Sequence, residues 1–252
     1  QRRAYNPQNL HELFELRRHH PDAQLVAGGT DLSLEVTKRG ARYQTLINLG
    51  EVVELLDHQN LDEGWRLGAG LALTTVQEIL AGEVVAMEQM LRVFGSRPIR
   101  NRATLGGNLC TSSPIGDMAP VLIGLEAEAI IVGSTGERRI PLESFFTGYR
   151  QNILQEDEIL AALFLPRPND HTVSRAYKIS RRRDLDISAV SLCASLELEE
   201  DQTVKRIRLV FGGVAATTIR ATPVENWLQG KTWNHAHVRR MWCDLLVWSI
   251  FF

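Results

Sequence analysis

The chain has 252 residues, of which 44% are hydrophobic and 23% are charged, and its formal net charge is −2. This composition is typical of a globular protein with one large core or two to three smaller ones. Proteins that bind nucleic acid normally carry a basic excess, so the charge argues against that class of partner. The cysteines lie far apart, at Cys110, Cys193 and Cys243. They support no disulfide framework and no zinc or iron–sulfur cluster, and they favour a reducing cytoplasm.

The ends of the chain predict neither a signal peptide nor a membrane span. Gln1-Arg2-Arg3 leads into polar sequence, and the apolar stretch Leu245–Phe252 is far too short to cross a bilayer. Because Gln1 is not a start methionine, we expect residues before it. His235 and His237 would lie about 200° apart on a helix, so we predict no metal site there.

Helix and strand signals alternate in the first part of the chain. Apolar residues at helical spacing predict a helix over Leu10–His20, with Asn9 as its N-cap. Short apolar runs predict strands at Gln24–Ala27, Leu46–Leu49 and Trp65–Gly68. Ligand loops tend to follow strand ends, which makes the glycines directly after the first strand a candidate binding turn.

Helices are predicted next, followed by an antiparallel sheet. The helices are Val76–Leu80 after a Thr74-Thr75 cap, Met87–Phe94 before Gly95, and Met118–Leu125, for which Asp117 is a candidate cap. The strands are Ala127–Val132, Arg138–Pro141 and Glu158–Leu165.

A proline-rich segment, 166–170, interrupts both kinds of pattern and predicts a domain boundary. Beyond it we expect strands at Ala176–Ile179, Ile187–Leu198 and Val204–Val214, and a helix from Thr222-Pro223 to Leu228 that stops at Gly230.

Two glycine-rich segments are the candidate ligand-binding segments of the sequence: VAGGTDL at Val26–Leu32 and ATLGGNLCTSSPIGD at Ala103–Asp117. Glycine permits turns with positive φ and lets a backbone approach a phosphate closely. We therefore interpret the two segments as turns that form a divided cradle for a phosphate-bearing cofactor. Neutral donors and acceptors flank the glycines, namely Thr30, Thr104, Asn108, Thr111 and Ser112, and neither segment contains lysine.

Other common motifs are absent from the sequence. It has no G-x-x-x-x-G-K-[ST] loop, and LGAGLALT at Leu67–Thr74 lacks the third glycine of a dinucleotide fingerprint. There is no G-x-S-x-G and no H-E-x-x-H, and no nucleophile or general base is evident. We accordingly predict no catalytic side chain and no metal ligand.

The chain resembles the FAD-binding portion of a known family, the xanthine dehydrogenase family of molybdenum-flavin hydroxylases. The resemblance runs from Tyr5-Asn6-Pro7 to about Trp233 and is carried by AGGTDL, FGSRPIRNRATLGGN, SPIGD, YKISRRRDLDISAV and FGGVAATTIRA. The FGSRPIRNRATLGGN motif is most similar to that of the small subunit of bacterial xanthine dehydrogenases. The tail RRMWCDLLVWSIFF departs from the family, so we expect that either the chain is truncated or its tail is altered.

The resemblance implies an α+β architecture. Residues 1–166 would form an FAD-binding domain of the PCMH/vanillyl-alcohol-oxidase type, with subdomains of about 1–55 and 56–166. Residues 171–252 would form a smaller α+β C-terminal flavoprotein domain with an antiparallel sheet.

The resemblance also implies a set of FAD contacts. These are Leu25, Val26, Ala27, Gly28, Gly29, Thr30, Asp31, Leu32, Phe94, Thr104, Gly106, Gly107, Asn108, Thr111, Asp117, Leu160 and Lys178. From the residues alone, Phe94 could be core at a helix end, Asp117 a helix cap and Lys178 a surface charge. If Gly28 and Gly107 hold phosphate, valine at either position should abolish FAD retention while the fold is largely kept.

The function implied is electron transfer through FAD. Electrons would come from a molybdenum centre through 2Fe-2S clusters on other domains or chains, and hydride would pass to NAD in the cytoplasm. A basic cluster has two interpretations: it favours the anionic reduced form of a nearby flavin and attracts the phosphates of NAD, or it is a solvated loop or strand edge. Its members are Arg175, Lys178, Arg181, Arg182 and Arg183. The alternatives are a carbon monoxide, aldehyde or aromatic CoA-ester hydroxylase with the same FAD relay, and a flavin-free scaffold.

Overall fold

A computed structural model describes residues 2–182 and 185–240. Its first part is a small parallel sheet in the order β1-β3-β2, formed by β1 (Arg3–Tyr5), β2 (Gln24–Val26) and β3 (Thr45–Asn48). Two helices connect these strands, α1 (Leu10–His19) and α2 (Leu32–Arg39). The Asn9 side chain accepts a hydrogen bond from the Glu12 amide at 2.9 Å, which confirms the predicted N-cap of α1.

The second part is a five-stranded antiparallel sheet in the order β4-β5-β10-β6-β7. Its strands are β4 (His58–Leu61), β5 (Gly64–Gly68), β6 (Glu128–Gly133), β7 (Gly136–Pro141) and β10 (Ile159–Pro166). The short helix α3 (Val53–Leu56) precedes this sheet, while the turn η1 (Leu142–Ser144) and the hairpin β8 (Phe146–Gly148) to β9 (Gln151–Asn152) lie between β7 and β10.

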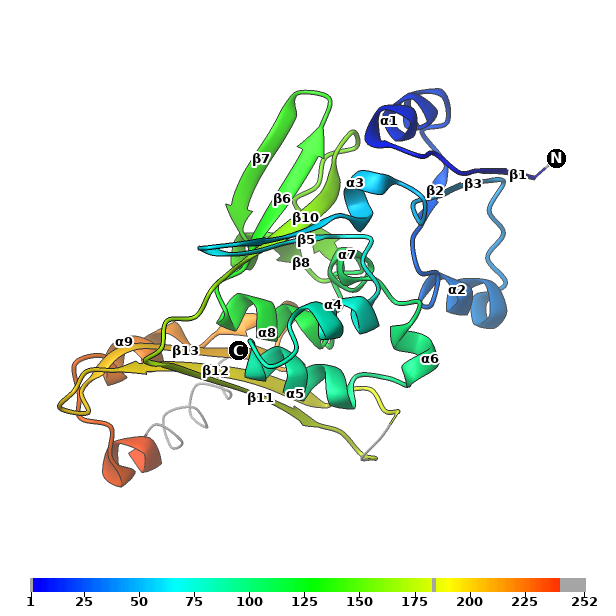
Figure 1. Ribbon diagram of the computed structural model, residues 1–252. Helices are drawn as coiled ribbons and strands as arrows, with labels where there is room; N and C mark the ends of the chain where they lie inside the picture. Colours follow the sequence, from blue (N-terminus) through cyan, green and yellow to red (C-terminus); the bar gives the residue numbers. More distant parts are fainter. Residues whose placement is uncertain (1, 183–184, 241–252) are drawn as a thin grey trace.

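A helical layer lies between this sheet and the C-terminal sheet (Figure 1). It contains α4 (Leu73–Ile79), α5 (Val85–Val93), α6 (Arg97–Arg100), α7 (Leu105–Cys110) and α8 (Met118–Gly124). Side chains such as Trp65, Met87 and Leu163 are completely or almost completely buried in one core that this layer shares with both sheets. Burial of each such side chain contributes roughly 1.5–3 kcal/mol.

The C-terminal sheet is antiparallel in the order β11-β12-β13-β14. It comprises β11 (Thr172–Ile179), β12 (Val190–Leu198), β13 (Val204–Gly212) and β14 (Ile219–Arg220), and α9 (Thr222–Leu228) packs on β13. On the inner face α8 comes very close to β12, since a Cβ atom on Gly124 would lie 2.6 Å from the Cys193 sulfur.

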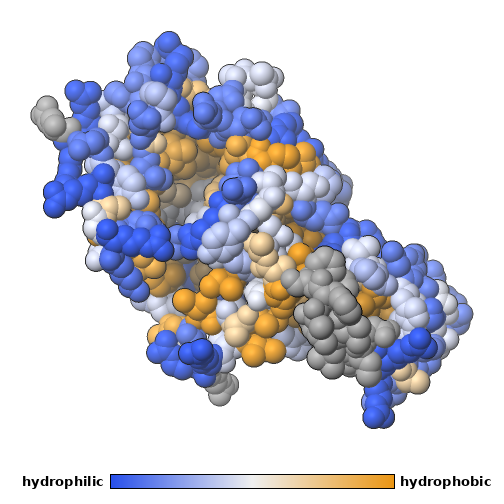
Figure 2. Space-filling view, turned by 180° about the vertical axis from the view of Figure 1, so that it is seen from behind, coloured by the Kyte–Doolittle hydropathy of each residue, from blue (hydrophilic) through white to orange (hydrophobic). Residues whose placement is uncertain are grey.

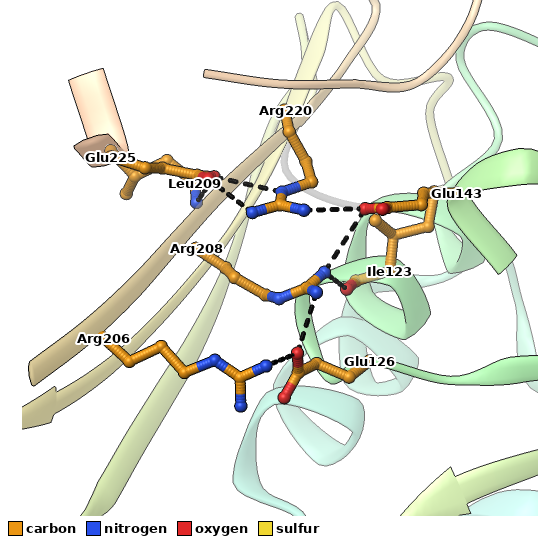
Figure 3. Close-up of polar contacts among 8 residues, drawn as sticks. All are labelled: Ile123, Glu126, Glu143, Arg206, Arg208, Leu209, Arg220 and Glu225. Atoms are coloured by element: carbon orange, nitrogen blue, oxygen red, sulfur yellow. Dashed lines mark hydrogen bonds and ion pairs between the residues drawn. The ribbon is translucent and has the colours of Figure 1, made fainter. Parts of the chain in front are cut away.

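Arginines of the C-terminal sheet form ion pairs with Glu126, just after α8, and with Glu143 in η1 (Figure 3). Arg208 lies between Glu126 at 2.7 Å and Glu143 at 3.4 Å, and it also donates to the Ile123 carbonyl at 3.1 Å. Arg206 pairs with Glu126 as well, and Arg220 bridges Glu143 to Glu225. Since Glu126 and Glu143 each contact two arginines, the network fixes the C-terminal sheet against α8 and η1.

The α+β class and the antiparallel C-terminal sheet are confirmed, as are most predicted elements to within a few residues. Two local predictions were wrong, and one of the two alternatives for Asp117, a side-chain cap, is not observed. Gly106-Gly107 lies inside α7 rather than in a turn, α4 has Ala72 at its N-cap position instead of Thr74-Thr75, and Asp117 makes no side-chain cap to α8. The helix α2 was not predicted at all. Arg183, Asp184, Cys243 and the aromatic tail lie outside the described residues.

Apolar side chains also reach the surface. Figure 2 shows them on the face turned away from the view of Figure 1. On the outer face of β11, Tyr177 and Ile179 are 55% and 64% exposed, and Ile187 in the following loop is 68% exposed. Exposed apolar patches of this kind are typical of surfaces that contact another protein. Within the described ranges, no helix combines the length and apolar character needed to cross a membrane.

Candidate functional site

The first glycine segment forms the loop between β2 and α2. Gly29 has φ +71°, a conformation that favours glycine, and a Cβ atom there would still have ordinary space. Gly28 is a glycine for a different reason, because a Cβ atom on it would lie 1.8 Å from the Arg102 carbonyl oxygen. Leu25, one position before the end of β2, packs on the buried cluster around Leu13 and Ile47.

The amides of this loop are open. No hydrogen-bond acceptor for the backbone N–H groups of residues 27–32 is found in the described part of the chain. The first amide with an intramolecular partner is that of Ser33, which donates to Gly29 O at 2.9 Å. Thr30 is half-buried and Asp31 is exposed, and the Asp31 side chain makes no cap to α2. Successive free amides at a strand end and a helix start form a concave donor surface for an anion.

The second glycine segment is built differently. Thr104 is the N-cap of α7, and its hydroxyl accepts from the Gly107 amide at 3.0 Å. The amides of Leu105 and Gly106 donate to the carbonyls of Leu71 and Ala69 at 3.0 and 2.7 Å. The backbone amides at the start of α7 are therefore already used. They do not supply the second half of the predicted cradle.

Packing explains the glycines of α7. A Cβ atom on Gly106 would lie 2.6 Å from the Ala69 Cβ and 2.9 Å from the Ala69 carbonyl oxygen. On Gly107 it would lie 2.6 Å from the Thr104 hydroxyl. Glycine at these positions lets α7 pack on the segment after β5 and keeps its N-cap.

Asn108 and Thr111 organise the turn from α7 to α8. The Asn108 side-chain oxygen accepts from the Met118 amide at 3.3 Å, and the Thr111 hydroxyl donates to the Asn108 carbonyl at 2.8 Å. Both side chains are half-buried, and Ser112 is buried with φ +46°. These contacts hold the SPIGD turn in place ahead of Asp117.

Asp117 and Lys178 contact each other. The Lys178 ammonium lies 2.7 Å from one carboxylate oxygen of Asp117, and the Ser188 hydroxyl donates to the other oxygen. Side-chain exposure is only 5% for Lys178 and 8% for Asp117, so Lys178 is not a surface charge. A carboxylate with two donors satisfies the buried charge, and the pair ties α8 to β11. Ser188 was not singled out from the sequence, although it lies in the YKISRRRDLDISAV segment.

The side chains of Phe94 and Leu160 make apolar packing contacts with the main core. Phe94 follows α5, is half-buried against the main core, and its carbonyl accepts from Arg100 at 2.7 Å. Leu160 lies in β10 next to an irregularity of the ladder and is 5% exposed within the same core.

The structure brings the two glycine segments together through Gly28 and Arg102, although about 75 positions separate them. The Asp117–Lys178 pair lies at the junction of α8 with the C-terminal sheet. The described ranges contain no group of three or more His, Cys, Asp or Glu side chains able to hold a metal ion. Burial raises the pKa of the Cys193 thiol to about 12, so this thiol stays protonated.

The residues present fit a dinucleotide such as FAD at the first loop. Free amides and a positive-φ glycine suit a diphosphate, which accepts hydrogen bonds and needs close backbone approach. The hydroxyls of Thr30, in the loop, and Thr104, two positions after Arg102, suit sugar and ribityl oxygens.

The sequence matches two known families. One, described as the FAD binding domain in molybdopterin dehydrogenase, matches residues 1–168. The chain belongs to this family. The other, the CO dehydrogenase flavoprotein C-terminal domain, matches residues 175–246.

Relatives of this FAD-domain chain include xanthine dehydrogenases. The chain is 33% identical over 254 residues to xanthine dehydrogenase of Calliphora vicina. The matched region covers 94% of this chain and 19% of that protein. It is 36% identical over 245 residues to xanthine dehydrogenase 2 of Arabidopsis thaliana, and this match covers 91% of this chain and 18% of that protein. The chain thus spans about a fifth of the length of the curated relatives it matches.

Solved structures share the fold. The carbon monoxide dehydrogenase from Hydrogenophaga pseudoflava matches with a TM-score of 0.89 and 24% identity, over 96% of this chain and 84% of that one. Quinoline 2-oxidoreductase from Pseudomonas putida 86 matches with a TM-score of 0.84 and 23% identity, with the same coverage. At these identities the likeness establishes the fold alone.

We predict that Gly28→Ala destabilises the protein more than Gly40→Ala does. The Gly28 methyl would collide with the Arg102 backbone and cost about 2–3 kcal/mol or more. Gly40 has φ +68° and open space, so alanine there costs only about 1 kcal/mol of backbone strain. Urea denaturation of the FAD-free variants measures both. This corrects the expectation that substitution at Gly28 leaves the fold largely intact, and equal stabilities would contradict it.

We also predict that Asp117→Asn lowers the free energy of unfolding by about 3–5 kcal/mol, because it leaves the buried Lys178 ammonium without its counter-charge. The double variant D117N/K178M should recover most of that loss. Denaturation without FAD separates this effect from cofactor binding. Glu15→Gln, at an exposed pair with Arg18, is the control and should change nothing measurable. A double variant as unstable as the single one would contradict the prediction.

Proposed function

We propose that this chain is the FAD-carrying electron-transfer part of a molybdenum hydroxylase of the xanthine dehydrogenase type. The observation that carries the proposal is the run of free amides at residues 27–32, in a chain that belongs to an FAD-binding family. The chemistry that FAD would supply is acceptance of single electrons from 2Fe-2S clusters and two-electron transfer to NAD. Molybdopterin and the clusters would lie on other domains or chains.

The residues of this chain would then bind and position the cofactor. The loop amides would donate to the diphosphate, with Gly28 held against Arg102 and Gly29 in its positive-φ conformation. The second glycine segment stays in the proposed set of FAD contacts, but its residues would meet the cofactor through side chains or close packing and not through free amides. These residues are Thr104, Gly106, Gly107, Asn108 and Thr111. Phe94, Asp117, Leu160 and Lys178 complete it.

The buried pair explains how a lysine could stay near a flavin without solvent. Asp117 and Ser188 fix the Lys178 side chain, so its position would not depend on the cofactor. A positive charge beside an isoalloxazine stabilises the reduced anionic form. We propose that this is the role of Lys178.

The partners are proposed on two grounds. The curated relatives named xanthine dehydrogenase are about five times longer than this chain, and the outer face of β11 exposes apolar side chains suited to a neighbouring domain. We propose a division into an FAD-binding domain over 1–166 and a C-terminal domain over 171–252, which the two family matches support. The cytoplasmic location and purine oxidation stay proposals too, the former supported by the scattered cysteines.

The nearest alternative is a hydroxylase with another substrate. Carbon monoxide dehydrogenase and quinoline 2-oxidoreductase share the fold, but at 24% and 23% identity, against 33–36% for the xanthine dehydrogenases quoted above. The sequence relationship therefore favours the xanthine type.

The purified chain should retain FAD. After addition of FAD and removal of the excess, we expect absorption bands near about 370 and 450 nm, the ordinary signature of a bound flavin. FAD should also raise the melting temperature, because a ligand that binds only the folded state stabilises it. A colourless protein with an unchanged melting temperature would contradict FAD binding by this chain and favour a scaffold.

Transfer to NAD has its own test on the FAD-loaded chain. Anaerobic NADH should bleach the band near about 450 nm, because two-electron exchange between flavin and nicotinamide is reversible. Dithionite serves as the positive control for reduction. If dithionite bleaches the band and NADH does not, the proposal that NAD is the acceptor is wrong while FAD binding stands.

A further inference from the structure

The first glycine loop contains no cation. From Val26 to Leu32 the only ionisable side chain is Asp31, which is exposed and negative. The next basic residues, Lys38 and Arg39, lie in the last turn of α2, and Arg39 pairs with Glu35 at 2.9 Å. A diphosphate in this loop would therefore meet free amides but no opposite charge from the loop itself.

Arg102 lies directly beside this loop. Its carbonyl oxygen occupies the place where a Gly28 Cβ would be, at 1.8 Å from that position, and the Ala103 Cα is 3.1 Å away from it. The backbone here is anchored on both sides, since the Arg102 amide donates to Ile99 O at 3.0 Å and the Ala103 carbonyl accepts from Leu73 at 2.9 Å. The start of the Arg102 side chain is thus fixed next to the open amides.

The Arg102 side chain has no interaction partner among the described residues. It is exposed, and it forms no hydrogen bond, ion pair or ring contact with any residue in the described ranges. Its neighbour Arg100, by contrast, is used internally and donates to the carbonyls of Phe94 and Gly95 at 2.7 and 3.3 Å. A free guanidinium beside a set of anion donors has two parallel N–H groups that match phosphate oxygens.

We propose that Arg102 supplies the positive charge for the diphosphate held by the loop at residues 27–32. The proposal rests on the proposed function, since it names a residue of the same FAD site. It assigns to one arginine from a distant segment the task that a lysine performs inside other phosphate loops. It also gives the Gly28 contact a second role, because that contact brings Arg102 to the loop.

The test compares FAD with riboflavin, which has the same ring but no phosphate. Arg102→Gln should weaken FAD binding about tenfold or more, the effect of one lost charged hydrogen bond, and leave riboflavin affinity unchanged. Arg102→Lys should restore part of the FAD affinity. Arg97→Gln is the matched control, since Arg97 is exposed and also lacks a side-chain partner in the described ranges. Flavin fluorescence titration gives each dissociation constant.

The outcomes separate the inference from the proposed function. If the unaltered chain binds no FAD, the proposed function fails. If it binds FAD and Arg102→Gln binds it equally well, only the Arg102 assignment is overturned. An equal loss for riboflavin and FAD, or an equal loss in Arg97→Gln, would also overturn it, because the effect would then be structural or a general effect of charge. Greater salt sensitivity of FAD binding in the unaltered chain than in Arg102→Gln would support it.

Discussion

The contact between Gly28 and the Arg102 carbonyl is the constraint on which the site depends. No Cβ atom fits between them, so the loop after β2 meets the segment between α6 and α7 only if position 28 is glycine. Among the described residues, none accepts a hydrogen bond from the backbone amides of 27–32, whereas the first amides of α7 donate to Leu71, Ala69 and Thr104. The two glycine segments therefore play unequal parts. One presents donors to an anion, and the other supplies the rigid surface that positions them.

The C-terminal sheet depends on close packing in the same way. Gly124 lets α8 reach β12, and arginines of β13 and β14 neutralise Glu126, just after α8, and Glu143 in η1. Within this junction Asp117 and Lys178 form a buried pair completed by Ser188. Replacing such a pair by apolar residues need not lower stability, so its presence agrees with a positioning role for Lys178. The proposed FAD site and the junction of α8 with the C-terminal sheet would share these residues.

Much of the fold could be predicted from the sequence. The Asn9 cap and the strands around the first loop follow from local patterns, whereas the antiparallel C-terminal sheet was an expectation from the family resemblance. The helix α2 could not, because Leu32, Leu34 and Val36 alternate with other residues as in a strand and none of its side chains is buried. The helix α7 could not be predicted either, because its two successive glycines have low helix propensity. The N-cap and the tertiary contacts of α7 outweigh that low propensity. The partner of Asp117 lies 61 positions away, and a non-local ion pair leaves no local signal.

Amide NMR of the isotopically labelled chain tests the central claim most directly. Titration with FAD should shift the backbone amides of residues 27–32 most strongly, since these are the free donors that would meet the diphosphate. The Leu105 and Gly106 amides, already bonded to Leu71 and Ala69, should change much less. Riboflavin should leave the loop amides nearly unchanged. Shifts concentrated in α7, with the loop amides unaffected by FAD, would contradict the account.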